Sequence, residues 1–225
     1  MLQKLSNLIL VFATILLTSC SSIGTNSPIN KQPSSSTNQT IGSNTTVATS
    51  ILEMNGIGYS SSSLFGSIPT KCTYRVAADG YLMPDSICTP GSINTEVNQN
   101  SLYTTICRAG GYTSSVRPPE SLTEPVKFEL MSAYHTDLKA SQIELDHLVP
   151  LELGGSSDVA NLWPEPNTGS PKEFNSINPY GYNAKDGVEG RLHDAVCSRQ
   201  VTLQQAQVAI VDNWTTALRS LNISP

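Results

Sequence analysis

One stretch in the middle of the chain decides how the fold is interpreted. It reads Glu144-Leu145-Asp146-His147-Leu148-Val149-Pro150, and it is followed by Gly154-Gly155 and by Asn161-Leu162-Trp163. Two apolar runs separated by a glycine turn predict a β-hairpin. Such a hairpin brings an acid, a histidine and an amide together, and this trio can hold a divalent metal and deprotonate a water. The pattern indicates a hydrolase.

Each residue type has its own chemical task. Asp146 offers a hard oxygen ligand, and His147, with an ordinary pKa near ~6.5, can accept a proton from water at neutral pH. Neighbouring strand residues point to opposite faces, so the two can serve one centre only where the strand twists or ends. Pro150 supplies that ending, because proline removes a ladder donor. The amide of Asn161, on the returning strand, is expected to fix the imidazole tautomer.

These residues resemble the HNH, or ββα-metal, nuclease superfamily. In that resemblance Asp146 matches the metal-binding acid, His147 the general base and Asn161 the central asparagine. It implies an α+β fold with a ββα-metal hairpin-helix core, and a nuclease that uses one divalent metal ion, Mg²⁺ in preference to Mn²⁺ or Zn²⁺. A wider resemblance, to secreted bacterial HNH-type proteins with a lipoprotein signal peptide, covers roughly residues 85–215 and rests on Cys88-Thr89-Pro90-Gly91, Thr105-Ile106-Cys107, Val116-Arg117-Pro118-Pro119, Asn161-Leu162-Trp163-Pro164-Glu165-Pro166, Lys185-Asp186 with Glu189, and Val196-Cys197.

The chain departs from the superfamily after the hairpin. In the superfamily a helix usually follows the hairpin at once, and it carries a His or Asn metal ligand three residues before a lysine. Here a loop from Glu165 to Tyr182 intervenes, and the residue three before Lys185 is Tyr182, a poor ligand for such a metal. The second metal ligand must therefore come from elsewhere.

A helix from Asn183 to Cys197 offers candidates. Asn183 is a favourable N-cap, and apolar residues recur at three- or four-residue spacing. Asp186, Glu189 and His193 share another face. We expect His193 and Asp186 to ligate the metal. Glu189 and Lys185 are expected to contact these ligands rather than the metal. The alternative is a solvated charged face that carries pairs such as Lys185 with Glu189.

The N-terminus predicts export. Lys4 precedes an apolar run, Leu8 to Leu17, that is too short to span a bilayer, and Leu17-Thr18-Ser19-Cys20 resembles a bacterial lipobox. Residues 1–19 are thus the expected lipoprotein signal peptide, and Cys20 the lipidated residue. Since no aspartate follows Cys20, sorting rules imply an outer-membrane rather than an inner-membrane anchor in the bacterial cell envelope. The mature chain is expected to have no transmembrane helix.

Two segments are expected after the signal peptide. Residues 20–66 are a flexible tether, rich in Ser, Thr and Asn, with an entry segment. Residues 67–225 are one HNH-like domain, with its core at about 130–197. Thr202 and Gln205 form a capping box that starts a C-terminal helix at about 202–221. Lys127 to Tyr134 is a further helix, whereas His135 is expected at the surface, and Trp163 and Trp214 in the core.

Four cysteines of the exported domain predict two disulfides, because export reaches an oxidising compartment. Three pairings are open, and we favour Cys72 with Cys88 and Cys107 with Cys197. The second bond closes a long loop and contributes on the order of 4 kcal/mol in the chain-entropy model. Metal ligation by these cysteines is the alternative, although the sequence has no CxxC pair.

Charge argues against tight nucleic-acid binding. Between Tyr134 and Cys197 four basic residues stand against ten acidic ones. Strong nonspecific binding normally rests on a basic face. Basic residues that could still line one groove are Arg108, Arg117, Lys127 and Arg191. Two classes of function remain: a lipid-anchored, metal-dependent endonuclease, and a noncatalytic envelope lipoprotein that uses an HNH-like scaffold for binding. Protein partners are not indicated.

Overall fold

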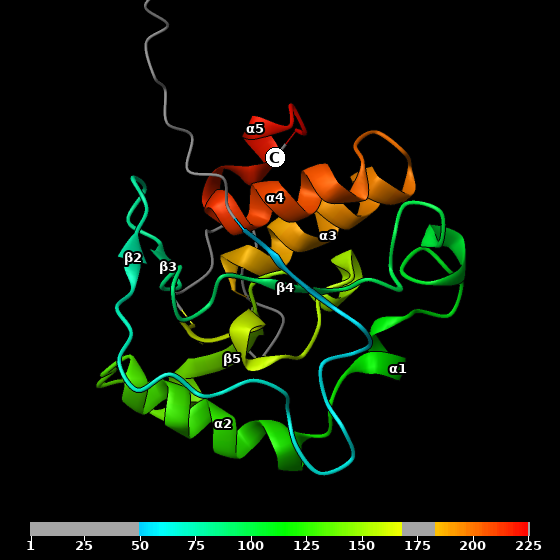
Figure 1. The fold of residues 1–225 in the computed structure, drawn as a ribbon. Coiled ribbons are helices and arrows are strands. Elements are labelled where there is room, and N and C mark those ends of the chain that lie inside the picture. The colour runs from blue at the N-terminus through cyan, green and yellow to red at the C-terminus, as the bar shows by residue number, and fades with distance from the viewer. Residues whose placement is uncertain (1–49, 168–182, 225) are drawn as a thin grey trace, which may run out of the picture. The chain divides into compact units, whose positions relative to one another are not determined.

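The computed structural model describes residues 50–167 and 183–224 (Figure 1). The expected signal peptide, the expected lipidation site Cys20 and most of the expected tether lie outside these residues, as does most of the loop expected between Glu165 and Tyr182. Within the described part, no helix has the length and apolar character needed to cross a membrane.

The fold is of the α+β class, as predicted. Its strands are β1 Leu52–Met54, β2 Arg75–Val76, β3 Leu82–Met83, β4 Ser92–Asn94, β5 Ile143–His147 and β6 Leu162–Pro166. Its α-helices are α1 Thr113–Val116, α2 Glu120–Ala133, α3 Ala184–Cys197, α4 Leu203–Asn213 and α5 Ala217–Ser220. Within the described residues the strands pair as β1 with β4, β2 with β3, and β5 with β6.

The predicted hairpin is present as the antiparallel pair β5–β6. Asp146 lies opposite Trp163 and His147 opposite Leu162. The connection is not a two-residue turn, because two short 3₁₀ helices, Leu151–Leu153 and Val159–Asn161, lie within it. Gly154 ends the first of them at φ +76°, a left-handed conformation that favours glycine. In Figure 1 the hairpin lies between α2 and α3.

The folded domain begins before residue 67, the boundary expected from the sequence. Strand β1 pairs in parallel with β4, and the carbonyl oxygens of Ile57 and Phe65 accept hydrogen bonds from the N–H groups of Ser157 and Val159. From its composition, the segment before residue 67 was expected to belong to the tether and its entry segment. Its backbone pairing instead makes residues 52–65 part of the support beneath the hairpin loop.

Helix α3 agrees with the sequence expectation, whereas two other helices differ. Helix α2 begins at Glu120, seven residues before Lys127, and contains Pro125. That proline lies in the second turn, where it forfeits a single backbone hydrogen bond. The C-terminal helix starts with the predicted Thr202–Gln205 capping box, but it is interrupted at Asn213. There the Asn213 side chain accepts a hydrogen bond from Thr215 N and starts a new turn.

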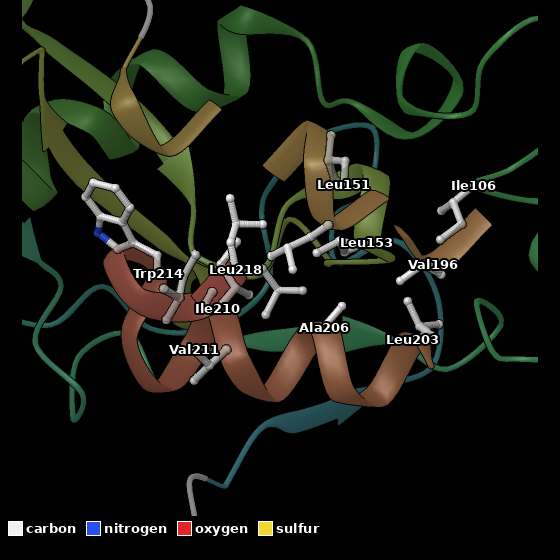
Figure 2. Close-up of a cluster of buried hydrophobic side chains, with 14 of the residues drawn as sticks. Ile106, Leu151, Leu153, Val196, Leu203, Ala206, Ile210, Val211, Trp214 and Leu218 are labelled. Carbon is white, nitrogen blue, oxygen red and sulfur yellow. The ribbon is translucent and has the colours of Figure 1, made fainter. Parts of the chain in front are cut away.

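The core joins α3, α4 and the hairpin loop. Figure 2 shows its apolar side chains, in which Leu153, Val196, Ala206 and Ile210 have no exposed surface. Trp214 is buried as predicted. This packing fixes α3 against the loop that carries the candidate site.

Both favoured disulfides are present, Cys72–Cys88 and Cys107–Cys197. The first lies in the N-terminal part of the domain. The second joins the segment after the 3₁₀ helix Leu102–Thr104 to the last residue of α3. The C-terminal end of α3 is thus tied covalently to a distant part of the chain.

Candidate functional site

The end of strand β5 brings Asp146 and His147 to one place. Both residues are only 7% exposed, and His147 is the last residue of the strand. Neighbouring strand residues normally point to opposite faces, so the strand end allows both side chains to border the same cavity. This agrees with the role expected for the Pro150 region as the end of the strand.

The imidazole of His147 is held by Ser157. Its Nε2 atom lies 2.8 Å from Ser157 Oγ, across the hairpin loop. Burial lowers the pKa of His147 to about 3, and the positive charges of Arg117 and Lys185 act in the same direction. The ring is therefore neutral at neutral pH, and the low pKa makes it a weak proton acceptor in the metal-free protein.

Asn161 does not orient the imidazole, contrary to the sequence expectation. Its Oδ1 accepts hydrogen bonds from the N–H groups of Val149 and Ser92, at 2.9 and 3.2 Å, and its Nδ2 donates to the carbonyls of Val149 and Ser156. The side chain is fully buried, and it satisfies backbone groups of the hairpin loop and of β4. Asn161 therefore shapes the loop, and Ser157 is the residue that contacts the imidazole.

Asp146 has one carboxylate oxygen engaged by protein. Its Oδ2 accepts hydrogen bonds from Trp163 Nε1, at 2.7 Å, and from Lys185 Nζ, at 2.8 Å. Trp163 is the cross-strand partner of Asp146, so the hairpin register itself sets this contact. Oδ1 has no hydrogen bond to any residue that the structure describes. The carboxylate is thus fixed through one oxygen and leaves the other for a ligand.

Lys185 is the cation at the centre of the site. Its side chain has no exposed surface, and its Nζ contacts Asp146, Glu189 and the carbonyl oxygen of His147. Burial disfavours its charge, but the negative charges of Asp146 and Glu189 outweigh burial and raise the pKa of Lys185. The alternative of a solvated helix face is therefore wrong for Lys185, although its expected pairing with Glu189 is present.

A small cavity of about 70 Å³ opens beside these groups. Its walls come from the end of β5, the hairpin loop, the first two turns of α3 and the segment after α1. The lining residues are Arg117, Glu144, Leu145, Asp146, His147, Pro150, Leu151, Asp186 and Glu189.

Negative charge gathers around this cavity in excess of the buried positive charge. Burial, and then the charges of Asp146 and Asp186, raise the pKa of Glu144 to about 7. Burial likewise raises the pKa values of Asp186 and Glu189. Burial disfavours the charged form of these carboxyl groups, and a bound cation would stabilise that form. The electrostatics of the cavity therefore favour a bound cation.

Of the two ligands expected on α3, Asp186 lines the cavity and His193 does not. One oxygen of Asp186 accepts a hydrogen bond from Asn183 N in the N-terminal capping box. His193 instead lies 3.0 Å from the carbonyl oxygen of Ile106 and 3.4 Å from Cys197 Sγ. Seven residues advance a helix by about 10 Å, so His193 shares the face of Asp186 but lies far along the axis.

The compact set of potential ligands in the described residues is a different one. Cys107, His193 and Cys197 have ligand atoms within 4.8 Å of one another, although the two cysteines form a disulfide. The carboxylates of the cavity are not gathered as closely. An open arrangement of this kind suits a cation that keeps several waters, as Mg²⁺ does.

The basic residues expected to share a groove are spread apart. Arg117 lines the site cavity, while Lys127 and Arg191 line two other cavities. Arg108 bonds the carbonyl of Gly111 and the hydroxyl of Ser115. His135 is exposed, as predicted.

Sequence reasoning missed Ser157, the role of Trp163 and the proximity of Glu144. The proximity of Glu144 to Asp146 could have been predicted from the sequence, because strand residues i and i+2 share a face. The Ser157 contact crosses an irregular loop and has no sequence signal.

Comparison of the chain with protein-family models, with curated proteins and with solved structures returned no match. The functional argument therefore rests on the site itself.

Proposed function

We propose that this protein is a divalent-metal-dependent endonuclease of the HNH type that hydrolyses phosphodiester bonds of nucleic acid and is lipid-anchored in the bacterial cell envelope, in the outer membrane. One observation carries the catalytic part. A neutral imidazole, His147, and a carboxylate fixed through a single oxygen, Asp146, line one cavity at the end of β5. The hairpin followed by α3 supports a ββα-metal core.

The residues present fit a hard divalent cation. Asp146, Asp186 and Glu189 supply carboxylate oxygens that border the cavity, and Lys185 and Trp163 hold Asp146 in a fixed orientation. Oxygen donors suit Mg²⁺ or Mn²⁺ better than Zn²⁺. Glu144, with its raised pKa, would gain its negative charge most readily when a cation is bound.

The chemistry divides between the metal and the chain. A bound divalent cation supplies a Lewis acid that polarises the phosphodiester and stabilises the departing oxygen. His147 accepts the proton of the attacking water, and Ser157 orients its ring through Nε2. Arg117, which is exposed and lines the cavity, is placed to attract a phosphate oxygen.

The acidic balance of the domain supports a second candidate, a noncatalytic envelope lipoprotein that binds through the same scaffold. Lys185 already forms ion pairs with both Asp146 and Glu189, as the lysine of a purely structural cluster would. In that case the cavity would have no hydrolytic activity.

The experiment is a cleavage assay with the full chain. The purified protein is incubated with plasmid DNA and with RNA in Mg²⁺, Mn²⁺, Zn²⁺ and chelator. Cleavage in Mg²⁺ or Mn²⁺ that chelator abolishes supports the endonuclease. Absence of cleavage under every condition, by a protein whose near-ultraviolet circular dichroism shows a folded domain, favours the binding protein.

A further inference from the structure

A second group of metal-ligating side chains lies at the C-terminal end of α3. The ligand atoms of Cys107, His193 and Cys197 all lie within 4.8 Å of one another. Cys107 and Cys197 are joined as a disulfide, so their sulfurs are not available as ligands in this state. Breaking that one bond would leave two thiols and an imidazole already gathered.

The helix provides two of the three groups in a favourable register. His193 and Cys197 are one turn apart on α3, so both side chains lie on the same face. Cys107 is fixed independently, since its N–H donates to the carbonyl of Leu102 at 2.8 Å. The third sulfur therefore approaches from a separate segment, which is the usual way a compact metal site is closed.

The two nitrogens of His193 have different neighbours. Nε2 lies 3.0 Å from the carbonyl oxygen of Ile106 and 3.4 Å from Cys197 Sγ, and Nδ1 lies 3.7 Å from a carboxylate oxygen of Asp194. A metal-bound histidine usually presents its other nitrogen to a carboxylate, which fixes the tautomer and strengthens the ligand. At 3.7 Å this contact is longer than a hydrogen bond, so the Asp194 side chain, which is 87% exposed, must move slightly to make it.

Solvent reaches the cluster. Cys107 and Cys197 are partly exposed, and the His193 side chain is 25% exposed. A small reductant and a metal ion can therefore both approach without unfolding of the domain.

We propose that reduction of the Cys107–Cys197 disulfide converts this end of α3 into a zinc site with Cys107, Cys197 and His193 as ligands. Two thiolates and an imidazole form the donor set that Zn²⁺ prefers, and a water completes four-coordination. The proposal does not depend on the nuclease function, because its residues are separate from the cavity at Asp146 and His147.

The steps balance with a dithiol as the reductant. The two sulfurs of the dithiol form a new disulfide, the bond between Cys107 and Cys197 breaks, and each cysteine receives one proton. Zn²⁺ then displaces these two protons. Nε2 of His193 gives up its contact with the carbonyl oxygen of Ile106 and coordinates without its proton, which moves to Nδ1 and faces Asp194. The disulfide and the metal exclude each other, and either one ties α3 to the segment that carries Cys107.

The test is zinc protection from alkylation, applied to the full chain. The protein is reduced with a water-soluble phosphine, the phosphine is removed without oxygen, and alkylation is followed by peptide mass spectrometry with and without Zn²⁺. We expect Zn²⁺ to slow alkylation of Cys107 and Cys197 at least roughly ten-fold while Cys72 and Cys88 react at an unchanged rate. Alkylation of Cys107 and Cys197 at the same rate with Zn²⁺ as without it would overturn the proposal.

Variants assign the ligands. His193→Ala should lose the protection, and Asp194→Asn should require about 10- to 100-fold more Zn²⁺ for the same protection, as expected for a carboxylate that supports a ligand. His135→Ala, at an exposed histidine, is the matched control. Protection of His193→Ala equal to that of wild type refutes the ligand set.

A second measurement covers the case in which reduction unfolds the domain. Co²⁺ bound by thiolates has a charge-transfer absorption that carboxylate ligands do not produce. The reduced full chain with Cys20→Ser, Cys72→Ser and Cys88→Ser should show this band with one equivalent of Co²⁺ and should lose it to Zn²⁺. A chain that remains unfolded and shows no band contradicts the proposal.

Discussion

The ammonium of Lys185 lies 2.8 Å from Asp146 Oδ2, and the lysine side chain has no exposed surface. A buried ion of this kind is retained only when its partners offset the desolvation. Here Asp146, Glu189 and the carbonyl oxygen of His147 do so. The contact links α3 to the end of β5, and it positions the carboxylate that faces the cavity.

Removal of the Lys185 charge should destabilise the domain strongly. Lys185→Met leaves two buried carboxylates without their partner, and breaking a buried pair in this way costs about 3–5 kcal/mol. Denaturant unfolding measures the change. Lys139→Met, at an exposed lysine, is the matched control and should change stability by less than about 0.5 kcal/mol. A Lys185→Met protein as stable as wild type would show that the ion pair does not support the fold.

Trp163→Phe should make the orientation of the Asp146 carboxylate less fixed, while the aromatic ring still fills most of the space in the core. The substitution keeps an aromatic ring but removes the N–H that donates to Asp146 Oδ2. A hydrogen bond to a charged group is worth about 1.5–3 kcal/mol. Trp214→Phe is the matched control, because it removes a donor to the neutral carbonyl of Leu82. That hydrogen bond contributes about 0.5–1.5 kcal/mol. We expect only Trp163→Phe to weaken metal binding, as measured by titration calorimetry; equal metal affinities would count against this role.

Glu144 should make stability fall as pH rises. Its pKa is raised from 4.5 to about 7, so between these values the folded state binds a proton that the unfolded state releases. Stability contributed by that proton is present below about pH 4.5 and is lost as pH approaches 7. Glu144→Gln removes this dependence, so its stability relative to metal-free wild type should increase across the window. Urea unfolding at several pH values checks this, with Glu124→Gln, at an exposed glutamate, as the control. A constant difference for Glu144→Gln contradicts the raised pKa.

The lipobox predicts that Cys20 anchors the protein. Cys20→Ser should move the protein from the membrane fraction to the soluble fraction of the envelope, or leave it unprocessed, because no thiol remains to receive the lipid. Cell fractionation with mass determination of the mature chain measures both outcomes. Unchanged fractionation and processing would eliminate the lipobox interpretation.

Local signals predicted much of the fold and part of the candidate site. Hydrophobic spacing and capping residues located the hairpin, α3 and the Thr202 start of α4, because these depend on neighbours in the chain. The burial of Lys185 was not predictable, since its partners Asp146 and His147 lie about forty residues away. The expectation that His193 ligates the metal in the cavity was wrong for a related reason. Helix periodicity shows which residues share a face, but not which part of that face contacts the hairpin.

Asp146→Ala and His147→Ala should fail in different ways. Loss of Asp146 removes an oxygen that faces the cavity, so excess divalent metal should restore part of the activity. Loss of His147 removes the proton acceptor, which no amount of metal replaces. Metal titrations of the cleavage rate distinguish the two. Identical responses to excess metal would contradict these separate roles.

The central claim is tested most directly by the rate at which wild-type protein and His147→Ala cleave plasmid DNA or RNA in Mg²⁺ or Mn²⁺. His135→Ala, at an exposed histidine, is the control and should retain the wild-type rate. The account predicts a loss of about 10²- to 10⁴-fold for His147→Ala, the range for a positioned general base, in a protein with unchanged circular dichroism. Metal-dependent cleavage by wild type and by His147→Ala at equal rates would contradict the mechanism.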